Sequence, residues 1–196
     1  MALADPREVI ETTASILGDR VTRLSNGETG LSRDWILGHH RLFERHKDFE
    51  EFTHVETADP RTPNHRRRRW RLKDGAKIPT AESFGATGYV EDAIEAHAII
   101  NRLKAEGRIS ASTRLLVTIP SPYDILNFAV AKSDFRKVLP AYEELLISEA
   151  RKIGALIPAQ NLALQWDAAH EFEYLATSSP MFAEQCIEST PFSGRR

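Results

Sequence analysis

The spacing of apolar residues predicts helices that alternate with short apolar runs. Residues 89–106 and 135–153 carry apolar side chains every three or four positions, which is the period of an amphipathic helix. Residues 115–119 are a continuous apolar run that is typical of a strand buried on both faces, and residues 162–164 are a short apolar run that predicts a buried strand. Strands joined through helices in this way predict an α/β fold with parallel βα units.

The N-terminal region continues the same alternation. Asp5 and Pro6 form a helix start, and the helical spacing that follows ends at Gly18. A short strand is predicted at residues 20–24, and a helical segment at residues 33–43. The three predicted strands are therefore far apart in sequence and separated by helices.

Polar residues follow each predicted strand, in the segments 26–30, 120–124 and 165–171. Because the carboxyl ends of parallel strands meet at one edge of a sheet, we expect these segments to form one substrate site. No catalytic residue is assigned. Ser121 is not surrounded by the Gly-x-Ser-x-Gly motif of a nucleophilic serine, so a nucleophilic role for it is weakly supported. The alternatives are a solvated turn in the first segment and a helix cap in the third. The candidate substrate-binding residues are Glu28, Ser121, Tyr123, Gln165, Asp167 and His170.

The least regular part of the sequence is residues 45–79. It contains the run Arg66–Arg69 followed by Trp70, and three interpretations are open: a solvated strand or hairpin, a lid over an anionic substrate, or a nucleic-acid contact. Nucleic-acid binding is disfavoured because the run is short and the formal net charge is −2. The nearby histidines 39, 40 and 46 do not form a metal motif and are expected at the surface.

Composition narrows the class of protein. Hydrophobic residues make up 41% and charged residues 28% of the 196 positions, which is ordinary for a soluble domain. Cys186 is the only cysteine, so an intrachain disulfide framework is excluded and a reducing cytoplasm is the expected compartment. No apolar run is long enough to span a membrane, and no membrane partner is expected.

Three motifs occur in the order of landmarks known from one superfamily. They are Asn-Gly-Glu-Thr-Gly at 26–30, Ile-Pro-Ser-Pro at 119–122 and Leu-Ala-Leu-Gln-Trp-Asp at 162–167. Together they resemble the cobalamin-independent methionine synthase-like proteins, which are related to uroporphyrinogen decarboxylase. The resemblance covers residues 9–175 and implies a (β/α)₈ TIM barrel. It also implies a methyltransferase-related activity, since members with methionine synthase activity move a methyl group from a folate to a zinc-bound thiolate.

The resemblance assigns roles to two candidate residues. Asp167 matches the aspartate of the Gln-x-Asp-Glu-Pro motif, which holds the amino group of the amino-acid substrate, and Glu28 lies in the first-strand substrate loop. The sequence departs from the methionine synthases at both motifs. Ala168 and Ala169 replace Glu-Pro, and the 26–30 loop replaces a Gly-Ser-x-Pro loop. Homocysteine specificity is therefore not carried over.

Length implies that only part of this barrel is present. A complete barrel takes about 250 residues, so we expect a truncated barrel-like domain of about four βα units at residues 1–177 and an irregular tail at 178–196. In the family the zinc ligands come from later strands, so neither zinc nor folate is assigned as a cofactor. Asp167, His170 and Glu171 offer a weak alternative metal site.

Two functional classes remain open. The first is an enzyme that acts on a small amino-acid-like or other anionic substrate, with its barrel completed by a homodimer or represented here by a fragment. The second is a non-catalytic remnant that serves as a binding or oligomerisation subunit. An exposed apolar barrel interior and open sheet edges would favour pairing with another chain.

Overall fold

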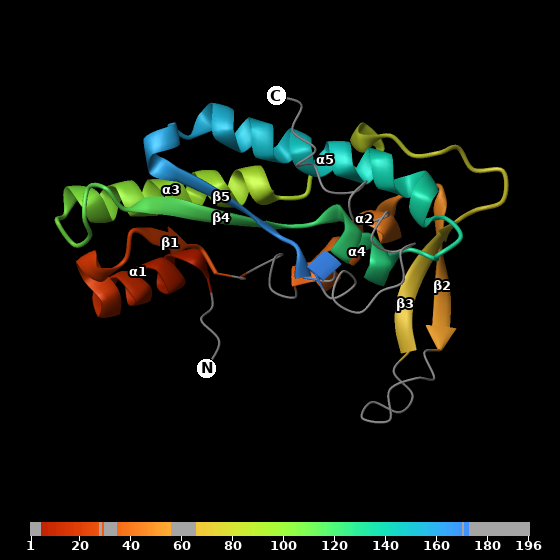
Figure 1. Cartoon of the computed structure of the whole chain (residues 1–196), viewed down its shortest axis with the longest axis horizontal. Coiled ribbons are helices and arrows are strands. Elements are labelled where there is room, and N and C mark those ends of the chain that lie inside the picture. The colour runs from red at the N-terminus through yellow and green to blue at the C-terminus, as the bar shows by residue number, and fades with distance from the viewer. Residues whose placement is uncertain (1–4, 28, 30–34, 56–65, 170, 173–196) are drawn as a thin grey trace. The chain divides into compact units, whose positions relative to one another are not determined.

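The computed structural model describes residues 5–27, 29, 35–55, 66–169 and 171–172. The chain divides into two compact units (Figure 1). We call residues 1–35, 86–119 and 146–167 the sheet unit, and residues 36–85, 120–145 and 168–196 the hairpin unit. None of the helices in these described segments combines the length and apolar character needed to cross a membrane.

A three-stranded parallel sheet organises the sheet unit. Its strands are β1 (Arg23–Ser25), β4 (Arg114–Pro120) and β5 (Leu162–Asp167), in the spatial order β1-β4-β5. Leu24 is the register partner of Leu115. The helices of this unit are α1 (Pro6–Leu17), α3 (Tyr89–Ala105) and the second half of α5 (Phe135–Leu156), with short 3₁₀ turns at Gly18–Arg20 and Ala159–Asn161.

Two helices of the sheet unit, α1 and α3, lie close to where the sequence predicts them, whereas the first strand is shifted. Asp5 caps α1 by accepting a hydrogen bond from the Glu8 backbone N–H at 2.8 Å, and Gly18 follows the last helical residue. The first strand lies at Arg23–Ser25 rather than at residues 20–24, because the chain first makes a 3₁₀ turn. The helix α3 ends at Ala105, close to the predicted position 106.

The strand β4 buries one face more completely than the other. Leu115, Val117 and Ile119 are at most 7% exposed, whereas Leu116 and Thr118 are half-buried. The prediction of full burial on both faces is therefore wrong for this strand. The connections explain the asymmetry, because right-handed crossovers between strands in this order place both crossover helices on the same face of the sheet.

An antiparallel hairpin organises the hairpin unit and occupies much of the region predicted to be irregular. Its strands are β2 (Phe49–Val55) and β3 (Arg66–Leu72), paired from Phe49 and Leu72 onward. Trp70 also forms a parallel bridge with Val130. The helices are α2 (His40–Arg45), α4 (Pro122–Ala129) and the first half of α5, with 3₁₀ turns at Trp35–His39 and Ala81–Phe84.

Aromatic rings fill the core of the hairpin unit. Phe43 is fully buried and stacks on Tyr142 with ring centroids 5.4 Å apart. Its other ring neighbours are Phe49 at 5.3 Å, Phe84 at 5.5 Å and Trp70 at 6.2 Å. Such edge-to-face and stacked pairs stabilise a core beyond the area they bury.

The fold class is therefore α/β, with a parallel sheet of three strands in the described part of the chain and no closed barrel. The helical segment predicted at residues 33–43 is a 3₁₀ turn followed by α2. Pro140 lies inside α5.

Candidate functional site

The loop after β1 lies at the carboxyl end of a strand of the parallel sheet and belongs to the first polar segment that the sequence singles out. After β1 the chain turns at Gly27, which has a φ of +66°, and the Gly27 N–H donates to Ser25 Oγ at 3.3 Å. A Cβ at Gly27 would lie 3.0 Å from Val9 Cγ1, so this loop packs directly on α1. Glu28 lies outside the described residues. The glycine in this loop therefore has a packing role that the sequence alone does not reveal.

A glutamine and a carboxylate form a pair at the end of β5. Gln165 and Asp167 project from the same face because side chains alternate along a strand. Gln165 Nε2 donates a hydrogen bond to Asp167 Oδ1 at 2.8 Å. Asp167 is half-buried, and its Oδ2 accepts no hydrogen bond from any described residue. The amide thus fixes one oxygen of the carboxylate and leaves the other able to bind a cationic group.

Ser121 and Tyr123 have structural contacts that account for their burial. Ser121 is the N-cap of α4, and its Oγ accepts a hydrogen bond from the Asp124 N–H at 3.0 Å. The Tyr123 ring packs edge-on against Phe135, with centroids 5.3 Å apart. Both residues belong to the hairpin unit, whereas Asp167 belongs to the sheet unit. Their predicted contact with substrate stays a prediction, and His170 lies outside the described residues.

Asp124 is a fully buried carboxylate in the second polar segment, and it is not among the six candidate substrate-binding residues. Its Oδ2 accepts a hydrogen bond from the Ala169 N–H at 3.0 Å, which ties α4 to the segment after β5. The signal in the sequence is its position at the third residue of a helix capped by Ser121, where a carboxylate is favoured. This hydrogen bond holds the segment after β5 against α4, so Asp124 has a structural role there.

Two of the three histidines expected at the surface, His39 and His46, are instead buried, and His40 is half-buried. His39 is 5% exposed and lies 2.7 Å from the Tyr142 hydroxyl through Nδ1. Burial, together with the positive charge of Arg41, lowers the pKa of His39 to about 3. Burial also lowers the pKa of His40 to about 4. Helical spacing could not reveal this, because the aromatic core that surrounds these rings is assembled from distant segments.

His46 and Ser83 form a pair that resembles a nucleophile and its base. His46 Nε2 lies 2.8 Å from Ser83 Oγ, but His46 Nδ1 accepts the Asp48 N–H at 3.2 Å. The ring is neutral because burial lowers its pKa, so the proton sits on Nε2 and is donated to Ser83. Ser83 in turn donates to the Thr80 carbonyl at 2.7 Å. A base needs a free lone pair on Nε2, so this pair cannot activate the serine.

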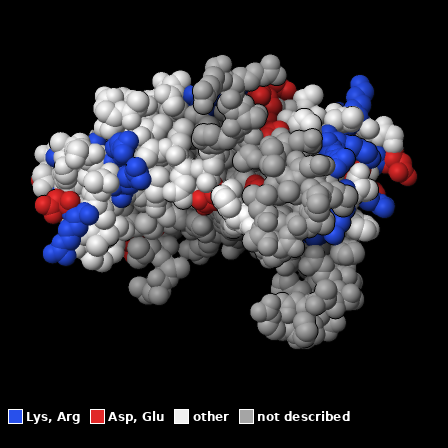
Figure 2. All heavy atoms as spheres, in the orientation of Figure 1, with Lys and Arg blue, Asp and Glu red and all other residues white. Residues whose placement is uncertain are grey.

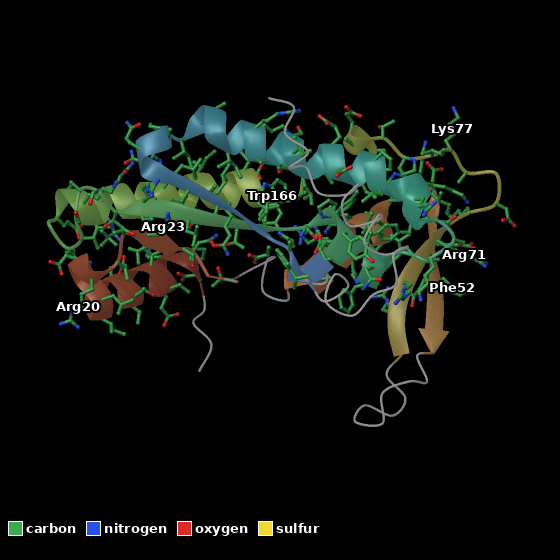
Figure 3. All side chains as sticks on the ribbon, viewed as in Figure 1. Arg20, Arg23, Phe52, Arg71, Lys77 and Trp166 are labelled. Atoms are coloured by element: carbon green, nitrogen blue, oxygen red, sulfur yellow. The ribbon has the colours of Figure 1, made fainter. Side chains whose placement is uncertain are left out.

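The arginine run lies in strand β3, which confirms the predicted strand or hairpin, but the strand is not fully solvated because Arg69 is buried. Arg68 contacts Glu44 at 3.1 Å and Glu51 at 3.0 Å, and its guanidinium lies 5.2 Å from the Trp70 ring centre. Arg71 contacts Glu50 at 2.7 Å and lies over the Phe52 ring (Figure 3). Acidic residues on α2 and β2 therefore neutralise the outward-facing charge of these two arginines.

No three potential metal ligands come together within the described residues. The alternative metal site at Asp167 and Glu171 depends on His170, which is not described. The zinc site that the family resemblance implies has no ligand set in this part of the chain, so we derive no step through a metal.

Comparison with known proteins gives no relative. No protein-family model matches the sequence, and no curated protein or solved structure is significantly similar to it.

Proposed function

We propose that the chain is a methionine synthase-like barrel protein that binds a small amino-acid-like substrate for a methyltransferase-related reaction. The observation that carries this proposal is the pair Gln165 and Asp167 at the carboxyl end of β5. The connectivity supports it, since β1, β4 and β5 are parallel neighbours in chain order with helices between them. A (β/α)₈ barrel repeats this arrangement and carries its sites at the carboxyl ends of the strands.

The chemistry of the pair suits an ammonium group. The free oxygen of Asp167 can accept a hydrogen bond from an α-ammonium group, and Gln165 holds the carboxylate in a fixed orientation. A hydrogen bond to a charged group contributes about 1.5–3 kcal/mol. The carboxylate would therefore position the substrate, while the residues that perform a methyl transfer are not assigned.

A binding measurement tests this role of Asp167. L-homocysteine and L-methionine are titrated calorimetrically into the full chain and into the Asp167→Asn variant, which keeps the shape of the side chain but removes its charge. We expect affinity to fall by about 10- to 100-fold, in line with the loss of a charge-assisted hydrogen bond. The Asp74→Asn variant, in the exposed turn after β3, serves as the control and should bind like wild type.

Two results would count against the proposal. If neither amino acid binds wild-type protein, a substrate of the homocysteine or methionine type is excluded. If the Asp167→Asn variant binds the amino acid as tightly as wild-type protein does, the substrate is held elsewhere and Asp167 is not a binding residue.

The edge of the sheet favours a second candidate function, that of a binding or oligomerisation subunit. β5 is the last strand in the sheet order, and its Leu164 is 42% exposed. An exposed apolar side chain on an edge strand favours pairing with another chain. Light scattering would then give a dimer mass for wild-type protein and a monomer mass for Leu164→Lys. A monomeric wild-type protein would exclude the homodimer.

A further inference from the structure

Two arginines lie side by side on the sheet unit. Arg23 begins β1, Arg114 begins β4, and the two are register partners in the parallel ladder. The Arg114 N–H donates to the Thr22 carbonyl at 2.9 Å, which fixes this register. Partners in a ladder project from the same face, and like charges placed opposite one another are destabilising. A negative charge near both guanidinium groups would therefore reduce the repulsion between them.

The described part of the chain does not supply that charge. Neither Arg23 nor Arg114 forms an ion pair or a side-chain hydrogen bond with any described residue. Other arginines of the same protein do have glutamate partners. They are Arg68, Arg71, Arg102 and Arg108.

The pair is accessible to a ligand. Leu24 and Leu115, the next residues along each strand, are buried on the opposite face of the sheet. Arg23 is exposed and Arg114 is half-buried. Basic side chains gather over β1 and the start of β4 in Figure 2, and Figure 3 labels Arg23 in this place. A small anion can thus reach both guanidinium groups from solvent.

We infer that Arg23 and Arg114 form a binding site for a small phosphate-type dianion at the amino end of the parallel sheet. Each guanidinium presents a planar fork of N–H donors that matches two phosphate oxygens. Two such forks on adjacent strands match the charge of a phosphate monoester or of inorganic phosphate. The site lies at the opposite end of the strands from Asp167, so it is independent of the proposed amino-acid site.

Titration of the full chain with inorganic phosphate at low ionic strength tests the inference. We expect saturable binding of phosphate to wild-type protein. The affinity should fall about tenfold or more in each of the single variants Arg23→Gln and Arg114→Gln, because each removes one charged guanidinium group. Binding should also weaken as salt is added, since the site is exposed. Arg71→Gln is the matched control, because it removes an exposed arginine that already has a glutamate partner.

The outcomes separate the site from general charge attraction. Absence of phosphate binding at millimolar concentration would overturn the inference, as would equal binding by wild type and Arg23→Gln. Equal weakening in Arg71→Gln would also overturn it, because any lost positive charge would then suffice. Arg23 is exposed, so its variant keeps the fold and remains decisive even if Arg114→Gln fails to fold.

Discussion

The sheet unit and the hairpin unit use buried polar groups to different extents. Most of the buried side chains of the sheet unit are aliphatic, and its buried carboxylate Glu149 accepts hydrogen bonds from Thr87 at 2.7 Å and Lys152 at 3.0 Å. The hairpin unit instead buries aromatic rings together with histidine, arginine and aspartate side chains. The buried polar residues described in this unit, a serine and a glutamate included, are His39, His46, Arg69, Ser121, Asp124, Asp134 and Glu171.

This difference bears on where function is to be sought. In the hairpin unit, polar side chains join segments that are distant in sequence. Asp134, for example, accepts the Leu72 N–H at 3.0 Å and the Lys137 ammonium at 2.7 Å. In the sheet unit, Asp167, Arg23 and Arg114 keep polar atoms that no described residue occupies. A buried polar residue such as Asp134 thus has a structural role, whereas the two proposed sites depend on polar atoms without a described partner.

The largest effect is expected from the aromatic core. Phe43→Ala removes a fully buried ring with four ring neighbours and should lower the free energy of unfolding by about 3–5 kcal/mol. Phe172→Ala, in the same unit but 68% exposed, should change it by less than about 0.5 kcal/mol. Urea unfolding measures both. Similar losses in the two variants would contradict the assigned core.

Glycine substitutions compare the loops of the two units. Gly27→Ala would strain a φ of +66° and push against Val9, so we expect a loss of about 2–4 kcal/mol. Gly75→Ala shares a positive φ of +75° but meets no atom within 4 Å, and only the strain of about 1–2 kcal/mol applies. Thermal unfolding gives both values. Equal losses in the two variants would show that the Val9 side chain moves away from the new methyl group at no cost in free energy.

Acid should weaken the hairpin unit through His39. Its pKa is about 3 in the folded protein and 6.5 ordinarily, so between these values the unfolded chain binds more protons. Stability is therefore full above about pH 6.5 and falls by about 1.4 kcal/mol per pH unit as the pH decreases. The His39→Asn variant should lose this part of the slope between about pH 6.5 and 5 in urea unfolding. An unchanged slope would mean that His39 titrates normally.

The smallest effects are expected from surface ion pairs in either unit. Arg68→Gln removes contacts with Glu44 and Glu51, whose side chains are 56% and 44% exposed, and should cost less than about 1 kcal/mol. Arg102→Gln removes the contact with Glu11 in the sheet unit and should cost equally little. Both losses should shrink in added salt. A larger loss for Arg68 would show that its contact with Trp70 contributes more than the ion pairs.

The candidate site was predictable to the extent that it depends on local sequence. The apolar run 162–164 and the polar residues after it place Gln165 and Asp167 at the end of a strand, as observed. The hydrogen bond between them follows from their spacing of two residues along one strand face. The cap formed by Ser121 competes with its predicted substrate role, and only the geometry of α4 reveals it.

The sequence by itself determined α1 with its Asp5 cap, α3, most of α5 and the three parallel strands, because these depend on the period of apolar residues and on backbone preferences of neighbouring positions. Tertiary structure decided which polar residues became buried and which remained accessible. His39 meets Tyr142, 103 positions away, and Arg23 meets Arg114 across a ladder between distant strands. Contacts between such distant positions leave no periodic trace in the sequence, since each partner alone satisfies only the pattern of its own element.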